Sequence, residues 1–284
     1  MNYQISSKNF DQPLLKPLLE ELTGFFDSID TKFFIIGATA RDMIMDAHGE
    51  KSSRTTRDLD IAIAIPDWKK YADIEEGLLK LKDFHKDNSQ KQRFIFQEFY
   101  TLDIVPFGEI MKLDDKIFWP PYEQIAMSVL GFDDVSKATI EIVIDDHLTL
   151  NTASLPGIFL LKIVAWKERH LMRIDDADDI GFILRNYFYI NEPRIVSDHI
   201  DLYDDPDFTT TTAGAMLMGR DIGAMLQSNF ETKQKISAIL ESEIAMEEES
   251  KLINHILETN RILKYEEVRK CISNVAAGIN HKSN

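Results

Sequence analysis

Three aspartates lie on segments that are otherwise apolar. Asp58 and Asp60 open a run that alternates from Leu59 to Ile65, and Asp103 lies among Leu102, Ile104 and Val105. Strand side chains two residues apart point to the same face, so Asp58 and Asp60 would repel each other on a buried face. A divalent cation removes that cost, and magnesium prefers oxygen ligands. If the two strands pair, three carboxylates converge and can hold two metal ions, as in phosphoryl and nucleotidyl transfer.

A glycine turn precedes these aspartates. The apolar run 32–36 predicts a buried strand that ends at Gly37, and 39–47 predicts a helix that follows at once. A turn of this kind presents backbone N–H groups and the positive end of the helix dipole, for which triphosphate oxygens are natural ligands. Ala38 keeps its backbone N–H. The structural alternative for Gly37 is a simple turn without a ligand.

The next helical positions carry two further candidates. Thr39 is expected to cap the helix or to donate its hydroxyl, and Arg41 is long enough to reach a phosphate. A helix-surface ion pair of Arg41 with Asp42 or Asp46 is an equally good interpretation.

The order of these motifs resembles that of the polymerase β-like nucleotidyltransferases. Those proteins carry a strand, a Gly-Gly or Gly-Ser turn, a helix, a strand with Asp-x-Asp and a third Asp on a later strand. The pattern here reads Gly37-Ala38, Asp58-Leu59-Asp60 and Asp103. Ala40-Arg41-Asp42 is also similar to tRNA CCA-adding enzymes and bacterial poly(A) polymerases. The segment 54–60 (RTTRDLD) is more similar to the AbiEii/AbiGii-type toxin nucleotidyltransferases.

This resemblance implies an enzyme that transfers NMP from an NTP to an acceptor hydroxyl and releases pyrophosphate. It implies two Mg²⁺ or Mn²⁺ ions as cofactors. Asp58 and Asp60 would hold both ions, while Asp103 would hold the catalytic ion and help to activate the acceptor. The turn at 37–39 would cradle the β- and γ-phosphates.

The second half carries two positions that match the AbiEii-like pattern. Lys162 lies on a predicted helix, and Asp176 follows in an acidic segment. The resemblance implies that Lys162 neutralises nucleotide charge and that Asp176 belongs to the same binding site. An ion pair between them is the structural alternative, and one pair could serve both purposes.

Two positions depart from the family pattern. Ala38 stands where a second glycine or serine is usual, so a hydroxyl is missing from the turn. Asp175 stands where a lysine usually precedes the aspartate, so Lys167 or Arg173 would have to supply that charge.

The acceptor is not readable from the sequence. A tRNA end, a protein hydroxyl and a small molecule such as an antibiotic all stay open, as does an antitoxin protein partner. A second hypothesis is a nucleotide-sensing or partner-binding module with weak or no turnover on the same fold. The departures at Ala38 and Asp175 motivate it, and the three intact aspartates oppose it.

The pattern of elements predicts an α+β protein with two domains. A small mixed sheet with flanking helices is expected over 1–148 and a helical domain over 149–284. The expected strands are 32–36, 59–65, 93–99, 101–106 and 139–144, and the expected helices of the first domain are 12–28, 39–47 and 68–81. The expected helices of the second are 156–170, 176–190, 212–228, 230–246, 248–259 and 263–278.

Composition narrows the class of protein. The formal net charge of −16 disfavours a whole-surface attraction to nucleic acid. With Cys271 as the single cysteine, a disulfide within the chain is impossible and a cysteine-based zinc site is very improbable. Neither a signal peptide nor a membrane-spanning run is evident, so we expect a cytoplasmic protein without a membrane partner. The aromatic segment 118–122 is expected to anchor a loop rather than to stack a base.

Overall fold

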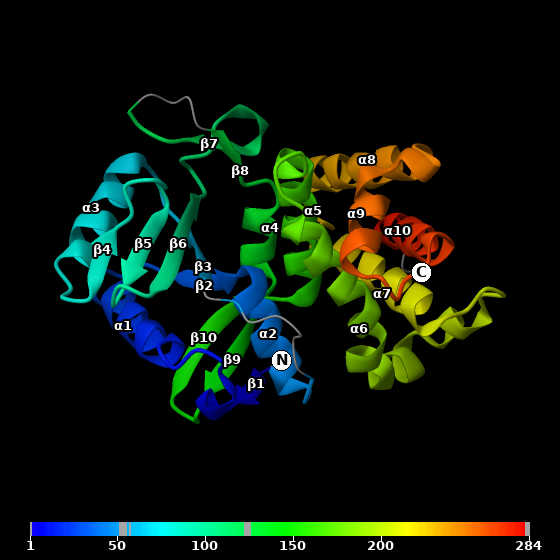
Figure 1. The fold of residues 1–284 in the computed structure, drawn as a ribbon, viewed down its shortest axis with the longest axis horizontal. Coiled ribbons are helices and arrows are strands. Elements are labelled where there is room, and N and C mark those ends of the chain that lie inside the picture. Colours follow the sequence, from blue (N-terminus) through cyan, green and yellow to red (C-terminus); the bar gives the residue numbers. More distant parts are fainter. Residues whose placement is uncertain (1, 51–55, 57, 122–125, 282–284) are drawn as a thin grey trace. The chain divides into compact units, whose positions relative to one another are not determined.

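The computed structural model describes residues 2–50, 56, 58–121 and 126–281. The chain divides into two compact units, Met1–Ser154 and Leu155–Asn284. Figure 1 shows a mixed sheet with helices in the first unit and helices in the second. This is the fold class predicted from the sequence. The first unit extends beyond residue 148 because a further strand, β10 (Leu148–Ala153), belongs to its sheet.

An eight-stranded sheet forms the centre of the first unit, in the order β1-β9-β10-β2-β3-β6-β5-β4. Besides β10, its strands are β1 (Asn2–Ile5), β2 (Phe33–Ile36), β3 (Asp58–Ala64), β4 (Phe84–Lys86), β5 (Arg93–Phe96), β6 (Tyr100–Phe107) and β9 (Thr139–Ile144). A separate two-stranded sheet contains β7 (Lys116–Phe118) and β8 (Ala126–Ser128).

The strands that carry the aspartates lie in the middle of this sheet. β3 runs parallel to β6 and antiparallel to β2. Leu59, Ile61 and Ile63 are fully buried on one face of β3, because alternate strand residues point to the same side. Asp58 and Asp60 therefore lie on the opposite face. Burial of the apolar side chains fixes which face receives the carboxylates.

Three strands of the eight-stranded sheet and both strands of the two-stranded sheet were not expected from the sequence. β1 and β4 are edge strands that each pair with one neighbour, β9 and β5. Both are short and carry polar residues, so their local pattern is weak, and pairing within the sheet supplies their order. β10 alternates buried leucines with exposed Thr149 and Asn151, which is the pattern of a half-buried strand.

The helices of the first unit are α1 (Leu15–Ser28), α2 (Gly37–Ala47), α3 (Trp68–Leu79) and α4 (Phe132–Lys137). In α1 the buried residues recur at helical spacing, as Leu15, Leu18, Leu22 and Phe26 illustrate. Trp119 is 4% exposed and packs against Trp68 and Tyr71, with ring centroids 4.9 and 5.3 Å apart. The aromatic segment thus serves as an anchor at Trp119, while Tyr122 lies outside the described residues.

The second unit contains six longer helices among its described residues. They are α5 (Leu155–Arg169), α6 (Asp175–Asp198), α7 (Thr210–Met225), α8 (Phe230–Ala245), α9 (Lys251–Thr259) and α10 (Tyr265–Ile279). Each corresponds to a predicted helix, although α6 runs eight residues past the expected end at 190, through Pro193. Helices α7 and α10 approach closely because Gly219 and Gly278 lie at their contact, where an added Cβ would collide with backbone atoms of the partner helix.

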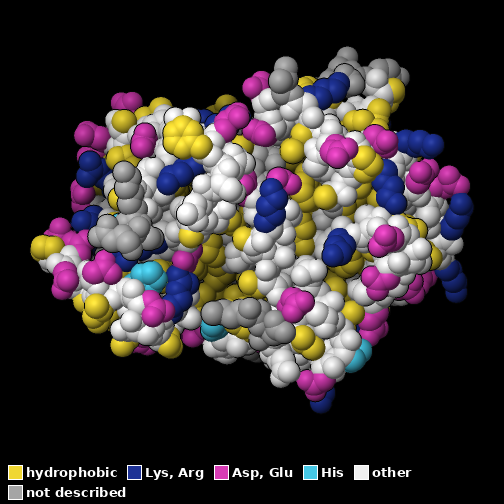
Figure 2. Space-filling view, turned by 180° about the vertical axis from the view of Figure 1, so that it is seen from behind, with side chains coloured by type: hydrophobic (Ala, Val, Ile, Leu, Met, Phe, Trp, Pro, Cys, Tyr) yellow, Lys and Arg dark blue, Asp and Glu magenta, His cyan; other side chains and the backbone are white. Residues whose placement is uncertain are grey.

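The net charge of the chain is negative, but the face drawn in Figure 2 has no large patch of a single sign of charge. There, Asp and Glu side chains are spread over both units and interspersed with lysines and arginines. Among the described residues, no helix combines the length and the apolar character needed to cross a membrane.

Candidate functional site

Strands β3 and β6 bring the three aspartates to one face of the sheet. In the parallel register of these strands Asp60 is opposite Asp103, and Asp58 is opposite Thr101. Residues in register on neighbouring strands share a face, so the strand pairing that the sequence left as a condition is observed. Asp58 is exposed, Asp60 is half-buried and Asp103 is buried.

Three carboxylates on one face offer the oxygen donors that magnesium and manganese prefer. The donor set therefore fits a divalent cation in chemistry and in placement on the sheet. Its present arrangement does not: over the described part of the chain, no group of three or more His, Cys, Asp or Glu residues is positioned to hold a metal ion. At Asp103, both carboxylate oxygens contact a neighbouring arginine.

Arg93 holds both oxygens of Asp103. Its Nε donates to Oδ1 and its Nη2 donates to Oδ2, each at 2.8 Å, in the fork geometry of a strong charge-assisted pair. The pKa of Arg93 is raised, first by this hydrogen bond and further by the charges of Asp103 and Asp58. Arg93 was not among the residues predicted for the site.

Gly37 lies directly beside Asp60. It has a φ of +71°, and an added Cβ would overlap Asp60 Oδ2 and lie 3.2 Å from Cγ. Glycine is required here by both the backbone conformation and the space. Because α2 begins at Gly37, the Asp60 carboxylate lies near the positive end of a helix dipole. Ala38, the second residue of α2, is half-buried.

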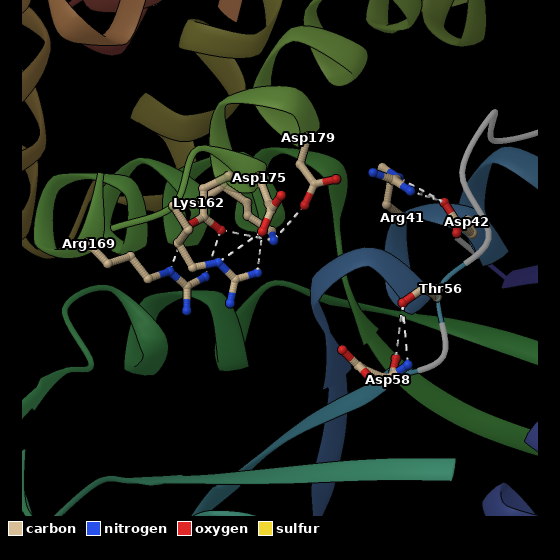
Figure 3. Close-up of polar contacts among 10 residues, drawn as sticks. Arg41, Asp42, Thr56, Asp58, Lys162, Arg169, Asp175 and Asp179 are labelled. Carbon is tan, nitrogen blue, oxygen red and sulfur yellow. Dashed lines mark hydrogen bonds and ion pairs between the residues drawn. The ribbon is translucent and has the colours of Figure 1, made fainter. Parts of the chain in front are cut away.

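Thr39 does not cap the helix, which corrects one of its two predicted roles. Helix α2 begins at Gly37 with Ile36 as its N-cap, so Thr39 already lies within its first turn. The buried Thr39 hydroxyl donates to the backbone oxygen of Asp58 at 2.9 Å. This bond joins the start of α2 to the start of β3. Thr56 lies within 3.5 Å of the Asp58 backbone nitrogen and oxygen (Figure 3).

Arg41 is only 2% exposed and is paired with its neighbour. Its Nε and Nη2 lie 2.8 and 2.6 Å from Asp42 Oδ1 (Figure 3). The ion pair with Asp42 considered from the sequence is therefore present, but Arg41 is buried and not on the helix surface. A phosphate contact by Arg41 stays a prediction. Arg54, Thr55 and Arg57, which carry part of the AbiEii-like motif, lie outside the described residues.

A cavity of about 100 Å³ borders α2. Its lining includes Thr39 and Tyr100, and Tyr100 points away from the face of Asp103 because the two alternate along β6. Burial raises the pKa of Tyr100, and the charges of Asp58 and Asp60 add to the increase. The acidic residues of the lining are Asp11, Asp42, Asp46 and Glu50. Their charges disfavour a triphosphate in this cavity.

In the second unit Lys162 belongs to a buried ionic network. Its Nζ lies 3.1 Å from Asp176 Oδ1 and 2.5 Å from Asp179 Oδ2, and both carboxylates are almost completely buried. Arg169 forks onto Asp176 with two bonds of 2.7 Å. Figure 3 shows these contacts between α5 and the start of α6. The structural alternative for Lys162 is thus observed, and a nucleotide contact stays a prediction.

Arg169 and Asp179 are members of this network that the sequence analysis missed. Their spacing carried a signal, since Asp179 lies one helical turn after Asp176 and Arg169 lies two turns after Lys162. Burial raises the pKa of Asp176, but Arg169 and Lys162 outweigh it and leave the pKa below its ordinary value.

Arg173 was one candidate for the charge missing at residue 175. It pairs with Asp175 itself, at 2.8 Å from Nη2 to Oδ2.

Comparisons with known proteins return a distant likeness of fold. Neither a protein-family model nor a curated protein matches the chain. A solution structure of the antibiotic-resistance factor ANT(2'')-Ia is 13% identical with a TM-score of 0.33, over 54% of this chain and 71% of that one. A crystal structure of ANT(2'')-Ia in complex with adenylyl-2''-tobramycin is 12% identical with a TM-score of 0.32, over 54% and 76%. At such low scores the function has to be argued from the residues.

Proposed function

We propose that the chain is a metal-dependent nucleotidyltransferase that moves NMP from an NTP to an acceptor hydroxyl. The observation that carries this proposal is the placement of Asp58, Asp60 and Asp103 on one face of the neighbouring strands β3 and β6. The Gly37 turn supports it, because it places the start of a helix beside Asp60.

Each part of this face has a task in the proposed reaction. The backbone N–H groups at Gly37, Ala38 and Thr39 would bind the β- and γ-phosphates at the start of α2. Asp58 and Asp60 would hold Mg²⁺ or Mn²⁺, and Asp103 would complete the set. The bound cations would polarise the α-phosphoryl group and offset the charge of the leaving pyrophosphate.

The transfer itself would exchange one bond for another at phosphorus. The acceptor hydroxyl oxygen forms a bond to the α-phosphorus, and the bond from that phosphorus to the oxygen bridging the β-phosphorus breaks. Pyrophosphate leaves with that oxygen. Asp103 would take the hydroxyl proton as a general base.

Only the resemblance bears on the class of acceptor, and it does not select one. Similarity of 54–60 to AbiEii-type toxins favours a tRNA end or a protein hydroxyl and an antitoxin partner, and a small-molecule acceptor is the third option.

The test is incubation of the protein with magnesium, each α-³²P-labelled NTP and cell extract, followed by separation of tRNA, protein and small molecules. Label should enter one fraction with wild type and be absent with Asp58→Asn.

The matched control for that variant is Asp73→Asn, which makes the same chemical change on the exposed surface of α3. It should transfer label as wild type does. Equal labelling by Asp58→Asn and Asp73→Asn would contradict the proposal.

One observation favours the second hypothesis, a nucleotide-binding module with little turnover. Both oxygens of Asp103 are engaged by Arg93, and a carboxylate in that state is a poor metal ligand and a poor base. NTP binding without magnesium-dependent transfer in the same assay would favour this alternative.

A further inference from the structure

We propose that Arg93 is a positioning residue that holds Asp103 while the carboxylate face carries no divalent cation, and that it must release Asp103 before a cation can bind there. This inference rests on the proposed function. It assigns a role to a residue outside the predicted site, which contacts one of the three carboxylates.

The contact is built into a β-hairpin. Arg93 on β5 lies directly opposite Asp103 on β6, so the two side chains share a face of the sheet. The backbone of Arg93 is fixed on both sides: its N–H donates to Gln90 O at 3.2 Å, and its carbonyl accepts from Asp87 N at 3.1 Å. The side chains of Arg93 and Asp103 are 30% and 12% exposed. The strand pairing and the backbone bonds of Arg93 therefore hold its side chain next to Asp103.

The fork and a divalent cation compete for the same carboxylate. The guanidinium uses both oxygens of Asp103, and a metal ion at those oxygens would add positive charge beside it. The groups whose charges act on Arg93 are Asp103, Asp58 and Asp87, so Arg93 also offsets the mutual repulsion of the carboxylate face. A bound cation would offset this repulsion in place of Arg93, so the hydrogen bonds from Arg93 to Asp103 would no longer be needed.

Two substitutions distinguish the effect of the paired hydrogen bonds of Arg93 from the effect of its positive charge. Arg93→Lys keeps a cation but loses the planar fork, and Arg93→Gln loses both. If Arg93 acts through the fork, both variants free Asp103 and bind a divalent cation more tightly. If it acts only by charge repulsion, Arg93→Lys stays at the wild-type affinity. The matched control is Lys91→Gln, an exposed cation of the same hairpin region for which no side-chain contact to a carboxylate is described.

The experiment titrates the full-length protein with Mn²⁺ and follows free Mn²⁺ by electron paramagnetic resonance. Arg93→Lys and Arg93→Gln should bind Mn²⁺ roughly threefold to tenfold more tightly than wild type, on the scale of a charge-assisted bond converted to affinity. Lys91→Gln should match wild type. Adding Asp103→Asn to Arg93→Lys should abolish the gain.

The failures of the two proposals are distinguishable. If Asp58→Asn weakens Mn²⁺ binding but the Arg93 variants bind no more tightly than wild type, the role of Arg93 is overturned and the metal site stands. If Asp58→Asn and Asp103→Asn leave Mn²⁺ binding unchanged, the metal site and the role of Arg93 both fail.

A measurement on wild type avoids reliance on variants that fold poorly. The Arg93 side-chain Nε–H, assigned by its loss in Arg93→Lys or by sequential NMR, should shift and exchange faster with water as Mg²⁺ is added. An Nε–H signal that stays unchanged at saturating Mg²⁺ overturns the inference.

Discussion

Gly37 and Asp60 lie so close that a side chain at residue 37 would have to displace the Asp60 carboxylate. The added Cβ would overlap Asp60 Oδ2, and the positive φ of +71° independently disfavours any other residue. This relationship links the first turn of α2 to the carboxylate face of β3. A glycine in this position is therefore tied to the placement of a carboxylate, and not only to a turn.

The first prediction compares two glycines of similar conformation. Gly37→Ala and Gly49→Ala both place alanine at positive φ, +71° and +76°, but at Gly49 the added Cβ would meet no atom within 4 Å among the described residues beyond its chain neighbours. Gly49→Ala should lose about 1 kcal/mol of unfolding free energy from backbone strain. Gly37→Ala should lose more and should also lose nucleotidyl transfer. Thermal melting and the label assay measure both, and equal behaviour of the two variants would contradict the proposed role of the Gly37 contact.

The second prediction concerns two of the three carboxylates, Asp58 and Asp103, in the metal-free protein. Asp58→Asn should leave the melting temperature unchanged or raised, since it removes one of several like charges. Asp103→Asn should lower it, because it breaks the fork from Arg93 at the 12% exposed carboxylate. Both variants should lose transfer. If Asp58→Asn melts well below wild type, a structural role for that carboxylate would be the better account.

The third prediction concerns Lys162, which contacts two buried carboxylates. Lys162→Ala should cost about 2–4 kcal/mol of unfolding free energy, because it leaves buried negative charge undercompensated. Lys235→Ala on α8 is the control, since its partner Glu231 is 77% exposed, and it should cost less than about 0.5 kcal/mol.

The same Lys162 variant tests the role implied by family resemblance. NTP affinity of the folded protein should fall roughly tenfold to a hundredfold if Lys162 contacts the nucleotide. A variant that melts early but binds NTP normally would remove Lys162 from the site and leave it with the ionic network alone.

The fourth prediction follows from the pKa of Asp176, which lies below the ordinary 3.8 in the folded protein. A depressed carboxylate pKa stabilises the fold at pH values above the unfolded pKa, and that contribution is lost as pH falls through the folded pKa. Wild type should therefore lose more stability below about pH 4 than Asp176→Asn, whose amide does not titrate. Melting curves of the two proteins from pH 6 to pH 2 provide the comparison. Parallel curves would argue against the depressed pKa.

The sequence identified the aspartates because their pattern is local. Asp58 and Asp60 interrupt an apolar alternation, and Asp103 lies among apolar residues, whereas the pairing of β3 with β6 was left as a condition. Arg93 was missed because its partner depends on the register of a hairpin. The hairpin turns at Gln97 and Glu98, which have φ of +48° and +63° without a Gly or Asn to mark them. A run expected to extend to residue 99 therefore ends at Phe96.

For a similar reason, the sequence predicted only two members of the ionic network in the second unit. Lys162 and Asp176 were found through a family pattern, whereas Asp179 lies one helical turn after Asp176 and Arg169 lies two turns after Lys162. Which carboxylate pairs with which cation depends on how α5 packs against α6, and the sequence does not specify that packing.

The most direct test of the central claim is calorimetry of a non-hydrolysable NTP analogue with wild type and Asp58→Asn, each with and without Mg²⁺. The carboxylate face beside the Gly37 turn predicts at least roughly tenfold tighter binding by wild type when Mg²⁺ is present, and loss of that difference in Asp58→Asn. Equal affinity of wild type for the analogue with and without Mg²⁺ would contradict the account.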